Sequence, residues 1–152
     1  MQFKKRKFIK FLGFSALAML FPIKALLAAT KEIINPNLSK EQKKIMFNEG
    51  TERAFTSDLL REKRKGFYHC ANCGNKLFAS TAKYESGTGW PSFSQALPGA
   101  FKTKIDYSFG MERVEYHCAK CGAHHGHVFN DGPRESGKRF CNNGLCLIFK
   151  PE

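Results

Sequence analysis

Two short cysteine motifs constrain the fold of this chain more than any other feature. Both have the form C-x-x-C-G, and they occupy residues 70–74 and 118–122. Four cysteines in two such pairs are a common donor set for one tetrahedral thiolate zinc site, and the glycine after each pair relieves crowding as the chain turns around the metal. The sequence therefore predicts one structural zinc per chain, bound by Cys70, Cys73, Cys118 and Cys121.

The same cysteines allow two other interpretations. In an exported chain they could form two disulfides, but a bridge within C-x-x-C closes a very small loop and constrains little of the chain. In a thiol-disulfide oxidoreductase one pair would be reactive, and metal content would separate the two cases because zinc-bound thiolates are unavailable for exchange. The number and softness of the ligands favour zinc, and four thiolates leave no open position for substrate.

The first 29 residues have the pattern of an export signal. Basic residues precede an apolar run over 11–23, and small residues follow at 28–29. The run is short for a transmembrane helix, and residues 5–10 resemble a twin-arginine signal with lysine in place of the first arginine. We expect residues 1–29 to direct export to the periplasm by the twin-arginine or the general secretory route. The alternative is an uncleaved membrane anchor over residues 8–28.

The rest of the chain is predicted to form one domain, residues 39–152, after a linker over residues 30–38. Residues 39–42 read Ser-Lys-Glu-Gln and fit a capping box, which predicts a helix of about three turns. A second short helix is expected over about 56–65. After Gly66, short aromatic and β-branched segments alternate with glycines. The expected fold class is mainly β, an antiparallel β domain with short N-terminal helices.

The net charge of +12 is concentrated at the start of the chain. Six of the 25 basic residues and none of the acidic ones lie in the predicted leader, so 19 basic and 13 acidic residues follow it, a net charge of +6. This excess is small for a nucleic-acid-binding protein, and a solvated basic face is the commoner explanation. We expect no nucleic acid among the partners. A non-catalytic zinc module that binds a polyanion is the alternative class, which salt-dependent retention on a polyanion would identify.

One cysteine outside the two motifs has the setting of a nucleophile. Cys141 follows the basic pair 138–139 closely and lies within twenty residues of His124, His125 and His127. Cationic neighbours lower the pKa of a thiol and keep the reactive thiolate populated. The sequence therefore predicts a thiol enzyme.

Five ordered motifs then resemble those of the B-type peptide-methionine (R)-S-oxide reductases. The motifs are Gly-Thr-Glu-Arg at 50–53, Ser-Gly-Thr-Gly-Trp-Pro-Ser-Phe at 86–93, Ser-Phe-Gly-Met at 108–111, the stretch from His124 to Pro133, and Arg-Phe-Cys-Asn-Asn at 139–143. The resemblance covers about residues 37–151 and implies two antiparallel sheets with a four-cysteine zinc site. It also implies repair of oxidised proteins or peptides by reduction of the R epimer of methionine sulfoxide, with a thioredoxin-like or other thiol reductant.

The resemblance assigns catalytic roles that agree with the chemistry. A sulfoxide sulfur is a poor electrophile until its oxygen is protonated. Cys141 would attack the sulfur and become a sulfenic acid. His124 and His127 would activate the oxygen by donating a proton or through a relayed water, and Asn143 would orient that network.

The substrate-binding residues implied in the same way are Trp90, Phe93 and Arg139. Trp90 would form an aromatic wall against the S-methyl group. Core packing is the alternative for Trp90, and a structural or surface role is the alternative for Arg139 and Asp131.

Two positions depart from the family pattern. His125 stands where the family usually has leucine, which indicates packing rather than catalysis. Thr88 stands where many members carry a resolving cysteine, so the usual intramolecular disulfide cannot form. If 141–146 is one extended strand, Cys146 lies about 16 Å from Cys141, too far for a disulfide. We therefore expect Cys146 to be a small buried apolar residue, unless a sharp turn over 142–144 brings the two thiols together.

Overall fold

The computed structural model describes residues 31–152, so the predicted export signal lies outside the described residues. Within this range no helix is both long and apolar enough to cross a membrane. In this described range the secondary structure consists of one α-helix, four short 3-10 turns and nine strands. They are α1 (Lys40–Asn48), η1 (Asp58–Leu60), β1 (Gly66–Cys70), β2 (Lys76–Ala79), η2 (Ser80–Ala82), β3 (Lys83–Tyr84), β4 (Ser92–Phe93), β5 (Phe101–Asp106), η3 (Ser108–Gly110), β6 (Arg113–Cys118), β7 (His124–Phe129), β8 (Arg139–Asn142), η4 (Gly144–Cys146) and β9 (Leu147–Pro151).

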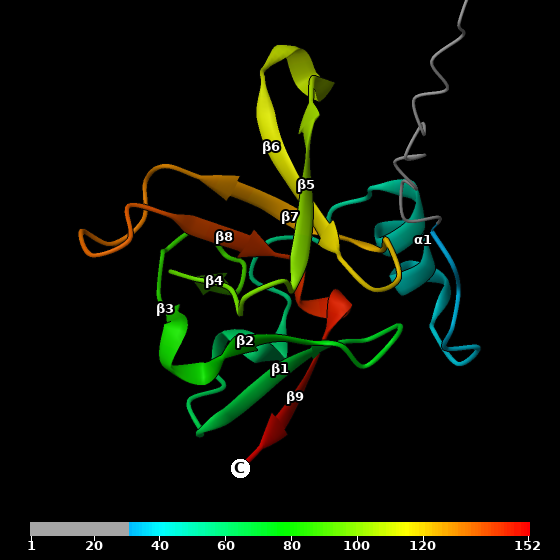
Figure 1. The fold of residues 1–152 in the computed structure, drawn as a ribbon, viewed down its shortest axis with the longest axis horizontal. Coiled ribbons are helices and arrows are strands. Elements are labelled where there is room, and N and C mark those ends of the chain that lie inside the picture. Colours follow the sequence, from blue (N-terminus) through cyan, green and yellow to red (C-terminus); the bar gives the residue numbers. More distant parts are fainter. Residues whose placement is uncertain (1–30) are drawn as a thin grey trace, which may run out of the picture.

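The strands form two antiparallel sheets, which confirms the predicted fold class (Figure 1). The smaller sheet has the strand order β2-β1-β9, and the larger has the order β3-β4-β8-β7-β6-β5. Consecutive strands β8 and β9 belong to different sheets, so the chain changes sheet at the turn η4. The larger sheet carries Cys141 on β8 and both His124 and His127 on β7.

An aromatic core joins the two sheets. Phe78 of β2 stacks on Phe93 of β4 with ring centroids 4.0 Å apart, and Tyr68 of β1 meets the same Phe93 ring edge-on at 4.9 Å. Phe101 and Tyr116 continue the cluster on the larger sheet at 4.7 Å. Aromatic pairs in such geometries add to the free energy of burial, so this cluster fixes the sheets against each other.

The first helix forms as its sequence predicts, and the second does not. Ser39 and Gln42 form the capping box of α1, with the Gln42 N–H donating to Ser39 Oγ at 3.1 Å and the Ser39 N–H to Gln42 Oε1 at 2.9 Å. The helix expected over 56–65 is only the turn η1, which is a correction to the prediction. Residues 61–65 read Arg-Glu-Lys-Arg-Lys and offer no apolar face to bury, so a helix there would gain nothing from packing.

The part of the predicted linker that the structure describes lies against the cysteine motifs. The N–H groups of Ile34 and Asn35 donate to Asn72 Oδ1 at 2.8 and 3.0 Å, and the Asn72 amide donates to the Glu32 carbonyl at 2.6 Å. The Glu32 N–H donates to the carbonyl of Cys121 at 3.2 Å. Residues 32–35 thus contact both cysteine motifs.

Candidate active site and metal centre

One row of residues crosses the larger sheet and holds the predicted nucleophile. Antiparallel pairing places Lys104, Glu115, His127, Cys141 and Ser92 opposite one another in turn on β5, β6, β7, β8 and β4. Directly paired side chains on one face of a sheet lie within interaction distance. The fold therefore places a carboxylate, an imidazole and a thiol next to one another, although they are separated by up to 26 positions in the sequence.

Cys141 and His127 open into a pocket of about 120 Å³. Trp90, Asn143 and Phe129 also line it, so the structure brings together four of the predicted site residues at one cavity. Cys141, Trp90 and His127 are each half-buried. The pocket therefore offers a thiol, an imidazole and an indole wall to one small ligand.

Burial works against the reactivity of the thiol. It raises the pKa of Cys141, while Arg139 and the Thr88 hydroxyl favour the thiolate and lower it, so that the net direction is upward. The sequence-based expectation of a lowered pKa is corrected here, because partial removal from water outweighs the nearby cation. Thr88, at the position of the family's resolving cysteine, is thus a close neighbour of Cys141.

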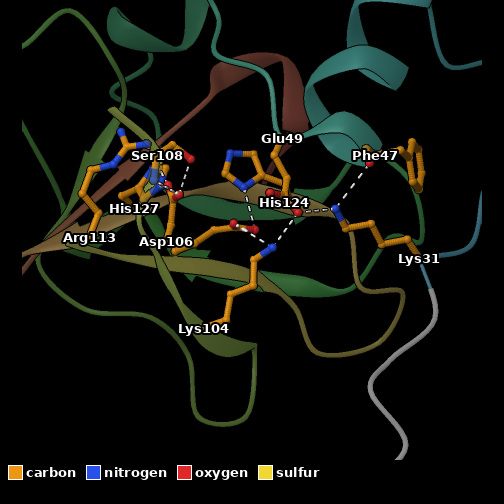
Figure 2. A network of polar contacts seen from close by, with 10 residues as sticks. Lys31, Phe47, Glu49, Lys104, Asp106, Ser108, Arg113, His124 and His127 are labelled. Atoms are coloured by element: carbon orange, nitrogen blue, oxygen red, sulfur yellow. Dashed lines mark hydrogen bonds and ion pairs between the residues drawn. The ribbon is translucent and has the colours of Figure 1, made fainter. Parts of the chain in front are cut away.

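His127 is held by a carboxylate that the sequence analysis missed. Its Nε2 lies 2.7 Å from Oδ2 of Asp106, the last residue of β5, and Arg113 Nη2 lies 2.7 Å from the same oxygen (Figure 2). Ser108 donates its N–H and its hydroxyl to the other oxygen; these bonds, with smaller contributions from His127 and Arg113, hold the pKa of Asp106 well below its usual range. An ionised carboxylate only accepts hydrogen bonds, so Nε2 of His127 bears the proton.

His124 lies beside His127 at one end of a chain of polar contacts that runs through Glu115 and Lys104 to Glu49 (Figure 2). Its ring packs edge-on against that of His127, with centroids 5.6 Å apart, and its Nδ1 lies 3.0 Å from Oε1 of Glu115. Lys104 Nζ lies 3.1 Å from the other oxygen of Glu115 and 2.5 Å from Glu49, which also meets Lys31 at 2.6 Å. Although burial raises the pKa of Glu115, His124 and Lys104 hold it below its ordinary value.

A β-bulge puts both histidines on the same face of the sheet. Tyr116 pairs with Gly126 and His117 with His124, so β7 has one residue more than β6 at His125. Residues an odd number apart normally point to opposite faces, and the extra residue reverses that parity. His125 itself is fully buried, with its ring edge-on to Phe101 at 5.5 Å, and burial lowers its pKa to about 4. Its predicted packing role is confirmed.

Glu52 ties three parts of the site together and was also missed. Its backbone carbonyl accepts the indole N–H of Trp90 at 2.9 Å, and its N–H donates to Asn143 Oδ1 at 2.8 Å. Its buried carboxylate accepts the N–H groups of Gly144 and Leu145 at 2.5 and 3.3 Å. Asn143 also donates its amide to the His125 carbonyl at 3.0 Å, so the indole wall and the turn after the nucleophile share one support.

Two predicted substrate-binding residues are not at the pocket surface. Phe93 is completely buried in the aromatic core, stacked on Phe78, which corrects its assignment to substrate binding. Arg139 forms two hydrogen bonds with Asp131, at 2.9 and 2.8 Å, and lies over the Phe129 ring at 4.4 Å. Arg139 therefore supports a pocket wall and the thiol beside it.

The segment after Cys141 turns sharply, contrary to the extended strand considered for 141–146. Strand β8 ends at Asn142, and the turn η4 leads into β9, with the Cys146 N–H donating to the Asn143 carbonyl at 3.0 Å. The Glu52 carboxylate stabilises this turn by accepting its free N–H groups. Cys146 is nevertheless fully buried, so its predicted place in the core is confirmed.

The two cysteine motifs converge, and their four sulfur atoms could hold a metal ion. All four Sγ atoms lie within 4.8 Å of one another. Those of Cys70 and Cys121 are 3.8 Å apart, and those of Cys73 and Cys118 are 3.5 Å apart. A tetrahedron with Zn–S bonds of about 2.3 Å has sulfur–sulfur edges of about 3.8 Å, whereas a disulfide is only about 2.05 Å long. The spacing fits a four-thiolate metal site and not a pair of disulfides.

Comparisons with known proteins agree with this geometry. The SelR domain family matches residues 38–151. The "Peptide methionine sulfoxide reductase MsrB" of Leptospira interrogans is 53% identical over 76% of this chain and 88% of its own length, and that of Methanosarcina barkeri is 48% identical over 76% and 82%. The protein of the same name from Variovorax paradoxus is 54% identical over 66% of this chain and 74% of its own length.

Among solved structures, the crystal structure of the Mis18 "Yippee-like" domain has a TM-score of 0.49 at 16% identity, over 59% of this chain and 98% of that chain. The SelR domain match covers nearly all of residues 31–152, and about half of the aligned residues are identical to those of the MsrB proteins. The chain therefore belongs to the SelR domain family and is a peptide methionine sulfoxide reductase of the MsrB type.

Proposed function

We propose that this protein reduces the R epimer of methionine sulfoxide in oxidised proteins or peptides, through a sulfenic acid on Cys141. The observation that carries the proposal is the placement of the Cys141 thiol directly opposite His127 in a pocket walled by Trp90. The resemblance to B-type reductases supports the R epimer, and repair of oxidised proteins is the biological role that this activity would serve.

The reaction needs a nucleophile and protons at neighbouring positions. Cys141 attacks the sulfoxide sulfur as the thiolate while the sulfoxide oxygen is protonated. The oxygen then passes from the methionine sulfur to the Cys141 sulfur, so that the S–O bond of the substrate breaks, methionine leaves as the thioether and Cys141 becomes the sulfenic acid. Two electrons pass from the thiol to the substrate sulfur, so one sulfoxide and one thiol give one thioether and one sulfenic acid. Burial raises the pKa of Cys141, so the thiol must release its proton before it attacks, and the released proton can serve the sulfoxide oxygen.

His127 is the proposed proton donor at the pocket. His124 packs against the His127 ring and is proposed to support it. Asp106 fixes the orientation of the His127 ring, and Glu115 does the same for His124. Burial lowers the pKa of His127 and so makes its protonated form a stronger acid, while Asp106 opposes that effect and helps to keep the protonated form populated. Asn143 orients the turn beside Cys141, and Trp90 packs against the S-methyl group.

We infer that the four-thiolate site holds zinc in a structural role. Four thiolates suit zinc, and with all four positions filled by protein the ion has no place for substrate. The ion would link the end of β1 to the end of β6, and so the smaller sheet to the larger.

The sulfenic acid requires an external thiol for its reduction. A first thiol condenses with it to give a mixed disulfide and water, and a second thiol releases Cys141. We propose a thioredoxin-like protein or another dithiol as the donor. The leader-like sequence of residues 1–29 supports an exported, periplasmic enzyme, or one anchored by residues 8–28, with its donor in the same compartment.

Steady-state reduction of the separated R and S epimers by the purified protein tests the proposal. We expect turnover of the R epimer with a dithiol and almost none of the S epimer. Equal turnover of both epimers, or turnover of S alone, would contradict it.

A further inference from the structure

A second groove borders the catalytic pocket on the other side of Trp90. It encloses about 230 Å³, and its lining includes Phe55, Leu60, Arg61, Tyr84 and Pro91. Trp90 lines both this groove and the pocket of Cys141, and its indole is fixed by the hydrogen bond to the Glu52 carbonyl. A ligand that reaches both cavities therefore passes over one rigid aromatic ring. We call the second cavity the Phe55 groove.

Phe55 occupies a backbone position that disfavours a large side chain. Its φ is 66°, in the left-handed region where a bulky residue is an outlier. The position is held firmly, because the Phe55 N–H donates to the Gly89 carbonyl at 2.7 Å. A Cβ at Gly89 would come within 2.9 Å of the Phe55 ring, so the ring lies directly on the loop that carries Trp90.

Folding does not account for a phenylalanine at this position. The residue is 71% exposed, so little of the hydrophobic gain of burying a ring is realised. Asparagine or glycine would adopt the left-handed conformation with less strain. Strained backbone positions and exposed aromatic side chains are both found preferentially at binding sites.

The geometry points to a subsite for an apolar or aromatic side chain that neighbours the oxidised methionine in a polypeptide substrate. This inference rests on the proposed function, because it needs the sulfoxide side chain in the Cys141 pocket. In an extended peptide the adjoining residues continue on either side of the reacting one at about 3.3 Å per residue. A neighbour of the methionine sulfoxide would then lie beyond Trp90, against the Phe55 ring.

The charges of the groove favour an apolar occupant over a charged one. Its charged residues are Arg61, Lys83 and Glu85, so both signs are present. The Lys83 ammonium already donates to the Leu60 carbonyl at 3.0 Å, and Arg61 faces Asp58 at 3.4 Å. The groove therefore has no excess of one charge that would select a charged side chain. The Phe55 ring supplies the main specific contact.

The test compares three substrates on the purified full chain. Two peptides carry phenylalanine or glycine on both sides of methionine sulfoxide, and the third substrate is N-acetyl-methionine sulfoxide amide. We expect kcat/KM for the phenylalanine peptide to exceed that for the glycine peptide by about two- to tenfold, from the usual strength of aromatic contacts. Phe55→Asn should remove this preference through KM without lowering the melting temperature, and Phe55→Tyr should keep it.

Ile33→Asn is the matched control, because Ile33 is 51% exposed and does not line the groove. It should leave the preference for phenylalanine as in the wild type. A wild type without the preference, or Phe55→Asn with the preference intact, would overturn the subsite. An equal loss on all three substrates in Phe55→Asn would also overturn it, because Phe55 would then act only by supporting Trp90. Failure of the wild type on all three substrates would instead refute the proposed function itself.

Discussion

Replacing Asp106 by asparagine should shift the pH dependence of catalysis in a direction fixed by the structure. The Asp106 carboxylate is ionised and lies 2.7 Å from His127 Nε2, where it favours the protonated imidazole and opposes the effect of burial on the His127 pKa. Asparagine keeps the size of the side chain and removes the charge. The pKa of His127 should therefore fall further in Asp106→Asn.

The size of the shift follows from the strength of the contact. A hydrogen bond to a charged group contributes about 1.5–3 kcal/mol, and one pKa unit corresponds to about 1.36 kcal/mol. At a pH above the His127 pKa, loss of this contact should thus lower the protonated fraction of His127 by about ten- to a hundredfold. If protonated His127 supplies the proton, kcat/KM declines as pH rises through this pKa. The decline should therefore begin at lower pH in the variant, and kcat/KM on its alkaline side should be about ten- to a hundredfold below that of the wild type.

Arg113 provides a comparison of opposite sign. Its guanidinium lowers the His127 pKa, so Arg113→Gln should move the same decline to higher pH, whatever it does to the maximal rate. The assay is kcat/KM for an R-sulfoxide peptide from pH 5 to 9, with circular dichroism at each pH to show that the variants stay folded. A decline in Asp106→Asn that stays in place or moves upward would refute the role of His127 as the proton donor.

Three further predictions test the rest of the site. Cys141→Ser should abolish sulfoxide reduction and leave folding and metal content unchanged, because it removes the nucleophile and no metal ligand; substantial remaining activity would contradict the assignment. Elemental analysis should find close to one zinc per chain. Cys118→Ser should lose the metal, and its free energy of unfolding should fall by several kcal/mol, because metal binding is coupled to folding. A metal-free wild type with two disulfides by mass spectrometry would contradict this. Lys104→Met should lower the free energy of unfolding in urea by about 1–2 kcal/mol, because buried Glu115 loses a cationic partner that is itself 44% exposed, whereas exposed Lys102→Met on the same strand should change it little.

The sequence predicted correctly those features that depend on residues close together in the chain. The capping box at Ser39 and Gln42 specifies the start of α1, and the aromatic segments separated by glycines specify short antiparallel strands. The C-x-x-C spacing identifies the four metal-binding thiols without knowledge of the fold that brings the two pairs together. The helix expected over 56–65 failed because charge alone does not make a helix that tertiary packing can stabilise.

The supporting carboxylates could not be found from local patterns. Asp106, Glu115 and Glu52 act through strand pairing and through contacts over as many as 93 positions, as between Glu52 and Leu145. The sequence did give a partial indication for Glu115. It stands between the apolar residues Val114 and Tyr116 in a predicted strand, so alternation places its side chain on the face opposite theirs. The bulge at His125 had no such signal, and without it strict alternation would place His124 and His127 on opposite faces.

The surroundings of Cys141 explain why recycling should depend on a thiol from outside. Thr88 lies beside Cys141 and contributes a hydroxyl where a resolving thiol would otherwise be. The sharp turn after Asn143 removes the distance argument against Cys146, but that thiol is fully buried, and burial raises its pKa well above the ordinary value. A buried thiol that stays protonated is a poor nucleophile. To reach Cys141 it would have to leave the core and break the bonds that Glu52 and Asn143 make to the turn, whereas the pocket already exposes Cys141 to a partner in solution.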